Sequence, residues 1–325
     1  MWPQHVVYAM EKVEDYPRNL LEFEDRFATD QGCLEYLIQI RWPNGFRCPA
    51  CQHAEAWHNC RGLFECRNCG RQSSVTSGTI LHQTRKPLKL WFRAMWHIAN
   101  QKYGANALGL QRTLGLGSYN TAWQWLHKLR RAMVRPVRDK LTGVVEVDET
   151  YIGGKRSGKR GRGAEGKALV AIAVEDKGEE GIGRIRLKHI EDASGDSLEK
   201  FIEEMVEPGA TIRTDDWNGY NGIKKLGYSH IIDPSNDMIL AHRIIALIKR
   251  WLLGAYQGAV RQSHLSYYLD EFTFRFNRRV SKSRGKLFYR LVQQAMLVDP
   301  APLATLKGAA LDFIAEGDED FDHNI

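Results

Sequence analysis

The sequence predicts an α/β fold, a mixed five-stranded sheet with helices, preceded by two smaller domains. From residue 144 onward, strand-like and helix-like segments alternate in the order strand, strand, strand, helix, strand, helix, strand, helix. Two Cys-x-x-Cys pairs and a helix-rich stretch precede them. We therefore expect an N-terminal helical segment at 1–45, a metal-binding ribbon at 46–86, a helical domain at 87–140, the α/β domain at 141–300 and an acidic tail at 301–325.

Charge points to a polyanionic partner. The 325 residues carry 46 basic and 39 acidic side chains, and the basic ones concentrate in 156–167, 243–250 and 275–290. Solvated lysine-rich faces are the alternative interpretation. No apolar run approaches the length of about 20 residues that spans a bilayer, and the first residues lack a signal peptide's pattern. We expect a soluble intracellular protein without a membrane partner.

The spacing of apolar residues predicts the first helices, and the spacing of cysteines predicts the metal-binding ribbon. Residues 17–40 have apolar spacing typical of two helices broken near residue 30, and Cys33 within this segment is expected to be a small buried residue. Fourteen residues then separate the two Cys-x-x-Cys pairs. Four thiolates from two such pairs form a tetrahedral site suited to structural Zn²⁺, whereas a redox motif comes singly. The expected ligands are Cys48, Cys51, Cys66 and Cys69; His53, His58 and Cys60 are spare candidates that we leave out.

The helical domain has the layout of a helix-turn-helix. Helices are expected after Pro87 and over 105–113, a glycine-containing turn follows, and Ser118 caps a third helix over 119–134. Its spacing buries Ala122, Trp125, Leu126, Leu129 and Met133 and leaves outside Asn120, Gln124, Lys128 and Arg131. An ordinary helical bundle fits the pattern equally well, but the position between a ribbon and a carboxylate domain favours DNA binding.

Two strands of the α/β domain carry carboxylates. The run 144–152 is β-branched and contains Asp148 and Glu149, and the run 211–214 stops at Asp215 and Asp216. The other expected strands are 168–175, 185–190 and 229–232, with helices near 198–205 and 238–253 and a short one carrying Trp217 and Tyr220. This order is that of the ribonuclease-H-like fold, in which the first and fourth strands are neighbours, so Asp148 and Asp215 can share divalent cations.

A glycine-rich loop at 153–167 carries six basic residues between the first two strands. We expect it to be mobile and to wrap a phosphate backbone. Its basic residues are Lys155, Arg156, Lys159, Arg160, Arg162 and Lys167.

From about residue 20 to 298 the chain resembles bacterial insertion-sequence transposases of the zinc-ribbon, ISXO-like branch, relatives of the eukaryotic Merlin elements. The resemblance rests on the four cysteines and on three motifs: Val147-Asp-Glu-Thr-Tyr-Ile-Gly-Gly-Lys155, Arg213-Thr-Asp-Asp-Trp-Asn-Gly-Tyr220 and Asp270-Glu-Phe-Thr-Phe-Arg-Phe-Asn-Arg-Arg279. It implies a DDE-type enzyme that cuts and joins DNA ends with Mg²⁺ or Mn²⁺. It places the first two catalytic aspartates at Asp148 and Asp215.

The third catalytic acid of the family is a glutamate seven residues before a lysine, and this sequence departs from that pattern. Here Lys249 matches the lysine and His242 stands in place of the glutamate, two helical turns earlier and on the same face. Imidazole ligates Mn²⁺ and, less well, Mg²⁺. The alternatives are a structural histidine, Asn236 or Asp237 as the ligand, or an inactive enzyme. Glu149 is expected on the opposite sheet face with a secondary role at most, and Asp216 is not expected to be a ligand.

The expected function is that of a DNA transposase acting by two-metal-ion phosphoryl transfer. Asp148 and Asp215 would hold one cation, Asp148 and His242 the second, and Lys249 a nearby phosphate. The expected partner is double-stranded DNA, the element's terminal inverted repeats and the target, bound by a homodimer or higher oligomer in the bacterial cytoplasm. A non-catalytic DNA-binding protein derived from a transposase and a nuclease on the same fold are the rival interpretations.

Overall fold

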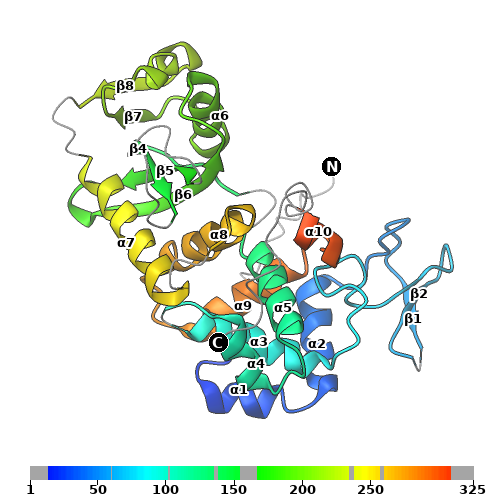
Figure 1. The fold of residues 1–325 in the computed structure, drawn as a ribbon. Coiled ribbons are helices and arrows are strands. Elements are labelled where there is room, and N and C mark those ends of the chain that lie inside the picture. Colours follow the sequence, from blue (N-terminus) through cyan, green and yellow to red (C-terminus); the bar gives the residue numbers. More distant parts are fainter. Residues whose placement is uncertain are drawn as a thin grey trace, which may run out of the picture.

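The computed structural model describes residues 14–59, 61–101, 103–134, 138–153, 167–233, 238–256 and 260–308. The five-stranded sheet lies at one end of an elongated molecule and the zinc ribbon at the other, with a cluster of helices between them (Figure 1). None of the helices within the described ranges is long and apolar enough to cross a membrane.

Side-chain caps fix the first two helices. Asn19 accepts a hydrogen bond from the Glu22 amide and begins α1 (Leu20–Arg26), and Thr29 accepts one from the Gly32 amide and begins α2 (Asp30–Arg41). The predicted interruption thus falls at the cap of α2. Cys33 is fully buried in α2, as predicted.

The ribbon is a three-stranded antiparallel sheet in the order β1 (Ala56–His58), β2 (Phe64–Cys66) and β3 (Gln72–Ser73). Aromatic contacts fasten it to the end of α2: the ring of Trp42 lies 4.8 Å from Phe64 and 5.0 Å from Phe46 between centroids.

The helical domain contains α3 (Leu88–Asn100), α4 (Ala107–Leu114) and α5 (Tyr119–Ala132). Gly115 ends α4 with a φ of 62°, a left-handed conformation that a glycine adopts without strain. Ser118 stands at the N-cap of α5, but its side chain makes no capping hydrogen bond. The five apolar residues predicted to be buried in α5 are buried.

The main sheet has the strand order β6-β5-β4-β7-β8. Strands β4, β5 and β6 are antiparallel, whereas β4 and β8 each pair in parallel with β7. This is the ribonuclease-H-like fold. The strands are β4 (Val144–Ile152), β5 (Ala168–Asp176), β6 (Ile182–Ile190), β7 (Thr211–Thr214) and β8 (Ser229–Ile232).

Helices cover both faces of this sheet (Figure 1). Helix α6 (Gly195–Met205) packs on the face that carries Val145 and Val147. Helices α7 (Ile239–Tyr256) and α8 (Leu265–Phe276) pack on the other face, which carries alternate residues of β4 from 144 to 152. The shorter 3₁₀ helices are Gly178–Glu180, Asn218–Tyr220, Ile223–Leu226 and Gln262–His264.

The last helices return to the helical domain. Helix α9 (Arg284–Ala295) and α10 (Leu303–Gly308) contribute Leu287, Leu291 and Leu306 to the same apolar core as α1 to α5. The domain boundaries stay a prediction, and α9, although it falls within the segment 141–300, packs against the N-terminal helices. The acidic tail from residue 309 onward lies outside the described residues.

Candidate active site and zinc site

Strand register brings Asp148 and Asp215 to neighbouring positions. In the parallel pair of β4 and β7, Glu146 lies opposite Arg213. Asp148 lies two residues after Glu146 within β4, and Asp215 directly follows Thr214, the last residue of β7. The negative charge of Asp215 is one of the influences that raise the pKa of Asp148, so the two carboxylates lie within electrostatic range. The two acids thus lie near each other, and their shared role in binding a cation stays a prediction.

Asp148 is held in a largely buried setting, with 15% of its side chain exposed. Burial is the main reason that the pKa of Asp148 is raised from 3.8 to about 6, and the charges of Glu149 and Asp215 add to it. The Glu149 amide, which donates to Asp148 Oδ1 at 2.7 Å, and His242 act in the opposite direction on this pKa. A buried carboxylate with other acids beside it is a position where a cation would be favourable.

His242 meets Asp148 from the first turn of α7. Its Nε2 atom lies 3.5 Å from Asp148 Oδ2, and 48% of the side chain is exposed. Lys249 follows two turns later, and its pKa is lowered by burial and by Lys167, while Asp148 raises it. Lys249 thus lies within electrostatic range of the same carboxylate. The other three predicted catalytic residues thus lie near Asp148, which is in the middle of β4.

The ligand atoms of the three candidate residues for a divalent cation lie farther apart than those of a compact metal site. Among the described residues, the four ribbon cysteines form the single group of three or more His, Cys, Asp or Glu side chains whose ligand atoms all lie within 4.8 Å of one another. Asp148, Asp215 and His242 do not reach that spacing together. Their donor set, two carboxylates and an imidazole, fits Mn²⁺ and less well Mg²⁺.

Glu149 faces away from this group. Tyr220, buried in the core beneath α6, donates a hydrogen bond from its hydroxyl to Glu149 Oε2 at 2.7 Å. Asp216 is exposed. Asn236, Asp237 and residues 154–166 of the basic loop lie outside the described residues.

The ribbon cysteines form a four-sulfur site. Cys48 Sγ lies 3.6 Å from Cys69 Sγ, and Cys51 Sγ lies 3.5 Å from Cys66 Sγ. Thiolates at about 2.3 Å from a tetrahedral Zn²⁺ are separated by similar distances. His58 instead stacks on Phe64, with 4.7 Å between the ring centroids. Cys60 lies outside the described residues, and His53 is not in the cluster.

Two family models match this chain. Residues 140–277 match the model described as ISXO2-like transposase domain, and residues 28–72 match the one described as transposase zinc-ribbon domain. The chain belongs to this transposase family. The two matched segments contain all eight predicted site residues.

The chain is also similar, at lower sequence identity, to one protein of a transposable element and to two solved structures. A protein of Halobacterium salinarum, described as an uncharacterized protein in transposable element ISH50, is 23% identical over 300 residues, which cover 83% of this chain and 98% of the relative. Two solved structures are also similar, each at 16% identity. One is the catalytic core domain of BIV integrase, with a TM-score of 0.29 over 40% of this chain and 81% of the integrase chain. The other is a simian T-cell lymphotropic virus intasome in complex with PP2A regulatory subunit B56 gamma, with a TM-score of 0.30 over 57% of this chain and 70% of that one.

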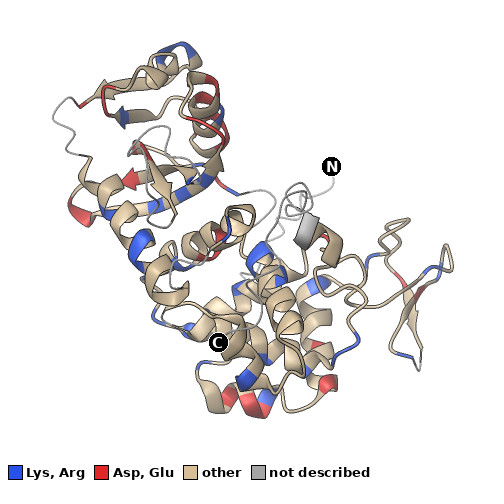
Figure 2. Cartoon of the chain, viewed as in Figure 1, with Lys and Arg blue, Asp and Glu red and all other residues tan. Residues whose placement is uncertain are grey.

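Basic side chains lie beside the acids of this transposase-family protein. Helix α7 presents Arg243, Lys249 and Arg250, all exposed, on the element that carries His242 (Figure 2). An exposed basic stripe next to a group of carboxylates suits a phosphate backbone.

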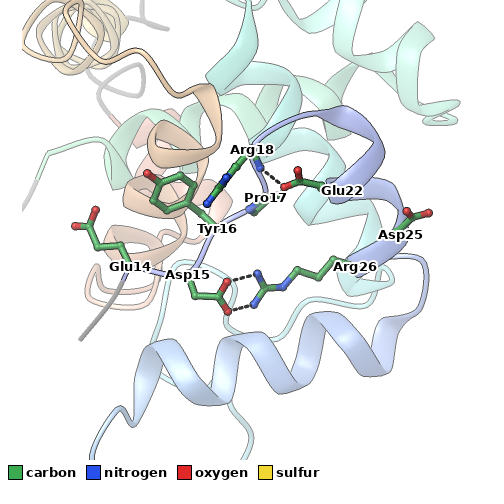
Figure 3. Close-up of a pocket in the computed structure, with 8 residues that line it drawn as sticks. All are labelled: Glu14, Asp15, Tyr16, Pro17, Arg18, Glu22, Asp25 and Arg26. Atoms are coloured by element: carbon green, nitrogen blue, oxygen red, sulfur yellow. Dashed lines mark hydrogen bonds and ion pairs between the residues drawn. The ribbon is translucent and has the colours of Figure 1, made fainter. Parts of the chain in front are cut away.

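A surface pocket lies elsewhere and does not mark this site. It is lined by residues 14–18, Glu22, Asp25 and Arg26, and Asp15 forms an ion pair with Arg26 across it (Figure 3). None of the predicted site residues lines it.

Sequence reasoning missed one residue beside the site, Glu146. It lies two residues before Asp148 and is almost fully buried. The available signal was a charged residue within a valine run that looks buried, because such a charge needs partners.

Proposed function

We propose that this chain is a DNA transposase that cleaves insertion-sequence ends and joins them to a target by two-metal-ion phosphoryl transfer. The observation that supports the proposal is the parallel pairing of β4 with β7, at whose end Asp215 follows within electrostatic range of Asp148, together with the 3.5 Å between His242 Nε2 and Asp148 Oδ2. Carboxylates from neighbouring strands are suited to hold the two cations of an in-line displacement.

Each residue has a distinct role in this proposal. Asp148 and Asp215 hold one divalent cation, and Asp148 and His242 hold the second. In these positions the residues would hold cations that supply Lewis-acid chemistry to the phosphoryl transfer. Lys249 binds a phosphate oxygen of the DNA strand beside Asp148 and so orients the scissile phosphodiester. The burial of Asp148 strengthens the charge interactions that this carboxylate makes.

DNA recognition is assigned to the N-terminal half. The zinc ribbon and helix α5 would bind the terminal inverted repeats, and two protomers would bring two ends together. Support comes from the four-cysteine site, from the helix-turn-helix order of α4 and α5, and from the exposed basic residues on α7. The reaction would take place in the cytoplasm, at the nucleoid.

This function can be tested by mixing the purified protein with a labelled duplex that carries an inverted repeat of the element, in the presence of Mn²⁺ or Mg²⁺. We expect nicking at the repeat and joining of the cut end to a second duplex. Asp148→Asn and Asp215→Asn should abolish both steps and leave end binding intact, whereas Asp216→Asn, which changes the exposed neighbouring carboxylate, should retain them. Cutting without joining would identify a nuclease instead.

A non-catalytic DNA-binding role is the second candidate. The loose grouping of Asp148, Asp215 and His242 and the histidine at the third position favour it. End binding by the wild-type protein with no metal-dependent nicking in either metal would establish this alternative.

A further inference from the structure

The first turn of α7 is capped by a carboxylate that comes from the sheet. Glu146 Oε2 accepts hydrogen bonds from the backbone amides of Leu240 and Ala241, both at 2.9 Å. The first amides of a helix have no partner within the helix, and a negative charge is favourable at that end. The side chain that satisfies them belongs to the strand that carries Asp148. Helix α7 is therefore attached to β4 at its first turn.

The same carboxylate binds a third element. Glu146 Oε1 accepts from Arg213 Nη1 of β7 at 3.3 Å, and that Nη1 atom lies 3.5 Å from Asp176 Oδ2 at the end of β5. Only 2% of Glu146 is exposed. A carboxylate so deeply buried is stable only with such partners, so their positions are fixed relative to it.

The three attachments lie next to the three candidate cation ligands. Glu146 is two residues before Asp148, Arg213 is two residues before Asp215, and Ala241 directly precedes His242. Each strand or helix that carries a candidate ligand is thus fixed to one carboxylate within two residues of that ligand.

We infer that Glu146 is a positioning residue for the catalytic site. It sets the first turn of α7, and with it His242, against Asp148 and Asp215, and it does not itself bind a cation because both of its oxygens are occupied by amides and a guanidinium. The inference rests on the proposed function. A displacement of about 1 Å of a reacting group can lower a rate by about 100-fold, which sets the size of the effect.

Three variants of the full-length protein test this inference. Glu146→Ala removes the cap and the partner of Arg213, whereas Glu146→Gln keeps a carbonyl oxygen for the amides and removes the charge. Glu175→Gln is the matched control, because Glu175 is a buried carboxylate of β5 that pairs with Arg184 and the Thr142 amide and has no hydrogen bond to α7.

The measurements are the rate of end nicking at saturating duplex over a Mn²⁺ titration, the Kd for the duplex, and amide hydrogen exchange over residues 238–244. For Glu146→Ala we expect a rate lower by about 100-fold, a higher Mn²⁺ concentration at half-maximal rate, an unchanged Kd and faster exchange in the first turn of α7. Glu146→Gln should recover part of the rate. Glu175→Gln should leave the Mn²⁺ dependence and the exchange of α7 unchanged.

Two results would overturn the inference: equal rate losses in Glu146→Gln and Glu175→Gln, or unchanged exchange over 238–244 in both Glu146 variants. If the wild-type protein nicks no DNA, the proposed function fails, and the exchange measurement still decides whether Glu146 holds α7.

Discussion

Arg130 and Glu271 form a fully buried ion pair that joins helix α5 to helix α8. Arg130 Nε lies 2.8 Å from Glu271 Oε2, and the side chains are 2% and 0% exposed. Burial alone would raise the pKa of Glu271, but the positive charges of Arg275 and Arg130 leave this pKa lowered. Arg275 also donates to the Ile98 carbonyl at the end of α3. One carboxylate of the sheet domain thus holds two arginines at its boundary with the helical domain.

Loss of this pair should destabilise the protein strongly. Arg130→Met removes the charge at similar length and leaves the buried Glu271 carboxylate with Arg275 and the Tyr256 hydroxyl as partners. Breaking a buried pair from one side costs about 3 to 5 kcal/mol, which we expect to see as a lower free energy of unfolding in urea.

The matched control is Lys188→Met, which breaks the pair with Glu204, whose side chains are 36% and 39% exposed. An exposed pair contributes less than about 1 kcal/mol. Equal losses in the two variants would show that the buried pair adds no special stability.

Local patterns predicted most elements because they depend on neighbouring residues. The strands Val144–Ile152, Thr211–Thr214 and Ser229–Ile232 have the predicted ends. There, β-branched runs stop at glycines or acids, and this signal is contained in the segment itself. The four cysteines likewise follow from spacing alone, because each pair forms its own tight turn.

What the sequence did not predict depends on tertiary contact. The return of α9 to the core of α1 to α5 carries no local signature, since its apolar stripe would fit any apolar surface. The charged partner of Glu146 lies 67 residues away along the chain, and that of Arg130 lies 141 residues away. The spacing of His242 and Lys249 on one helix face follows from their positions in the sequence, whereas the contact of His242 with Asp148 depends on the packing of α7 on the sheet.

The ribbon should depend on zinc for its structure. Cys69→Ser removes one of four thiolates, so we expect the bound zinc to fall from about one ion per chain and amide exchange over residues 46–73 to become fast, because so small a unit has little apolar core of its own. The main sheet should stay protected. Zinc content by atomic absorption and exchange by mass spectrometry measure these effects.

Cys33→Ala is the control for this prediction, since Cys33 is buried in α2 outside the cluster. It should keep the zinc. Retention of a full zinc equivalent by Cys69→Ser would contradict the four-sulfur site.

Asp148 should destabilise the protein at neutral pH when no catalytic cation is present. Its pKa is raised from 3.8 to about 6, mainly by burial, so the folded state holds the proton more tightly than the unfolded chain. The resulting stabilisation is complete below pH 3.8 and is lost as the pH rises through about 6. Asp148→Asn, which resembles the neutral form, should therefore be more stable than the wild type at pH 8, by about 3 kcal/mol, and this difference should shrink toward pH 5.

Urea unfolding of zinc-loaded protein in buffers freed of Mg²⁺ and Mn²⁺ measures this difference. Asp216→Asn, at an exposed position, should show no such dependence on pH. Addition of Mn²⁺ should stabilise the wild type and not Asp148→Asn. A variant less stable than the wild type at pH 8 without added cation would refute the electrostatic account of this carboxylate.

His242 should determine which metal supports the reaction. Carboxylate oxygens are the ligands that Mg²⁺ prefers, whereas imidazole is accepted more readily by Mn²⁺. We therefore expect the wild type to nick DNA faster in Mn²⁺ than in Mg²⁺, and His242→Glu to shift that ratio toward Mg²⁺. His242→Ala should lose activity in both metals.

Arg243→Ala, which changes the exposed neighbour of His242 on α7, is the control. It should keep the wild-type ratio of Mn²⁺-dependent to Mg²⁺-dependent nicking even if it weakens DNA binding. An unchanged metal ratio in His242→Glu, together with retained activity in His242→Ala, would mean that the imidazole is not a ligand despite its 3.5 Å contact with Asp148. Asn236 and Asp237 would then become the candidates for the third position.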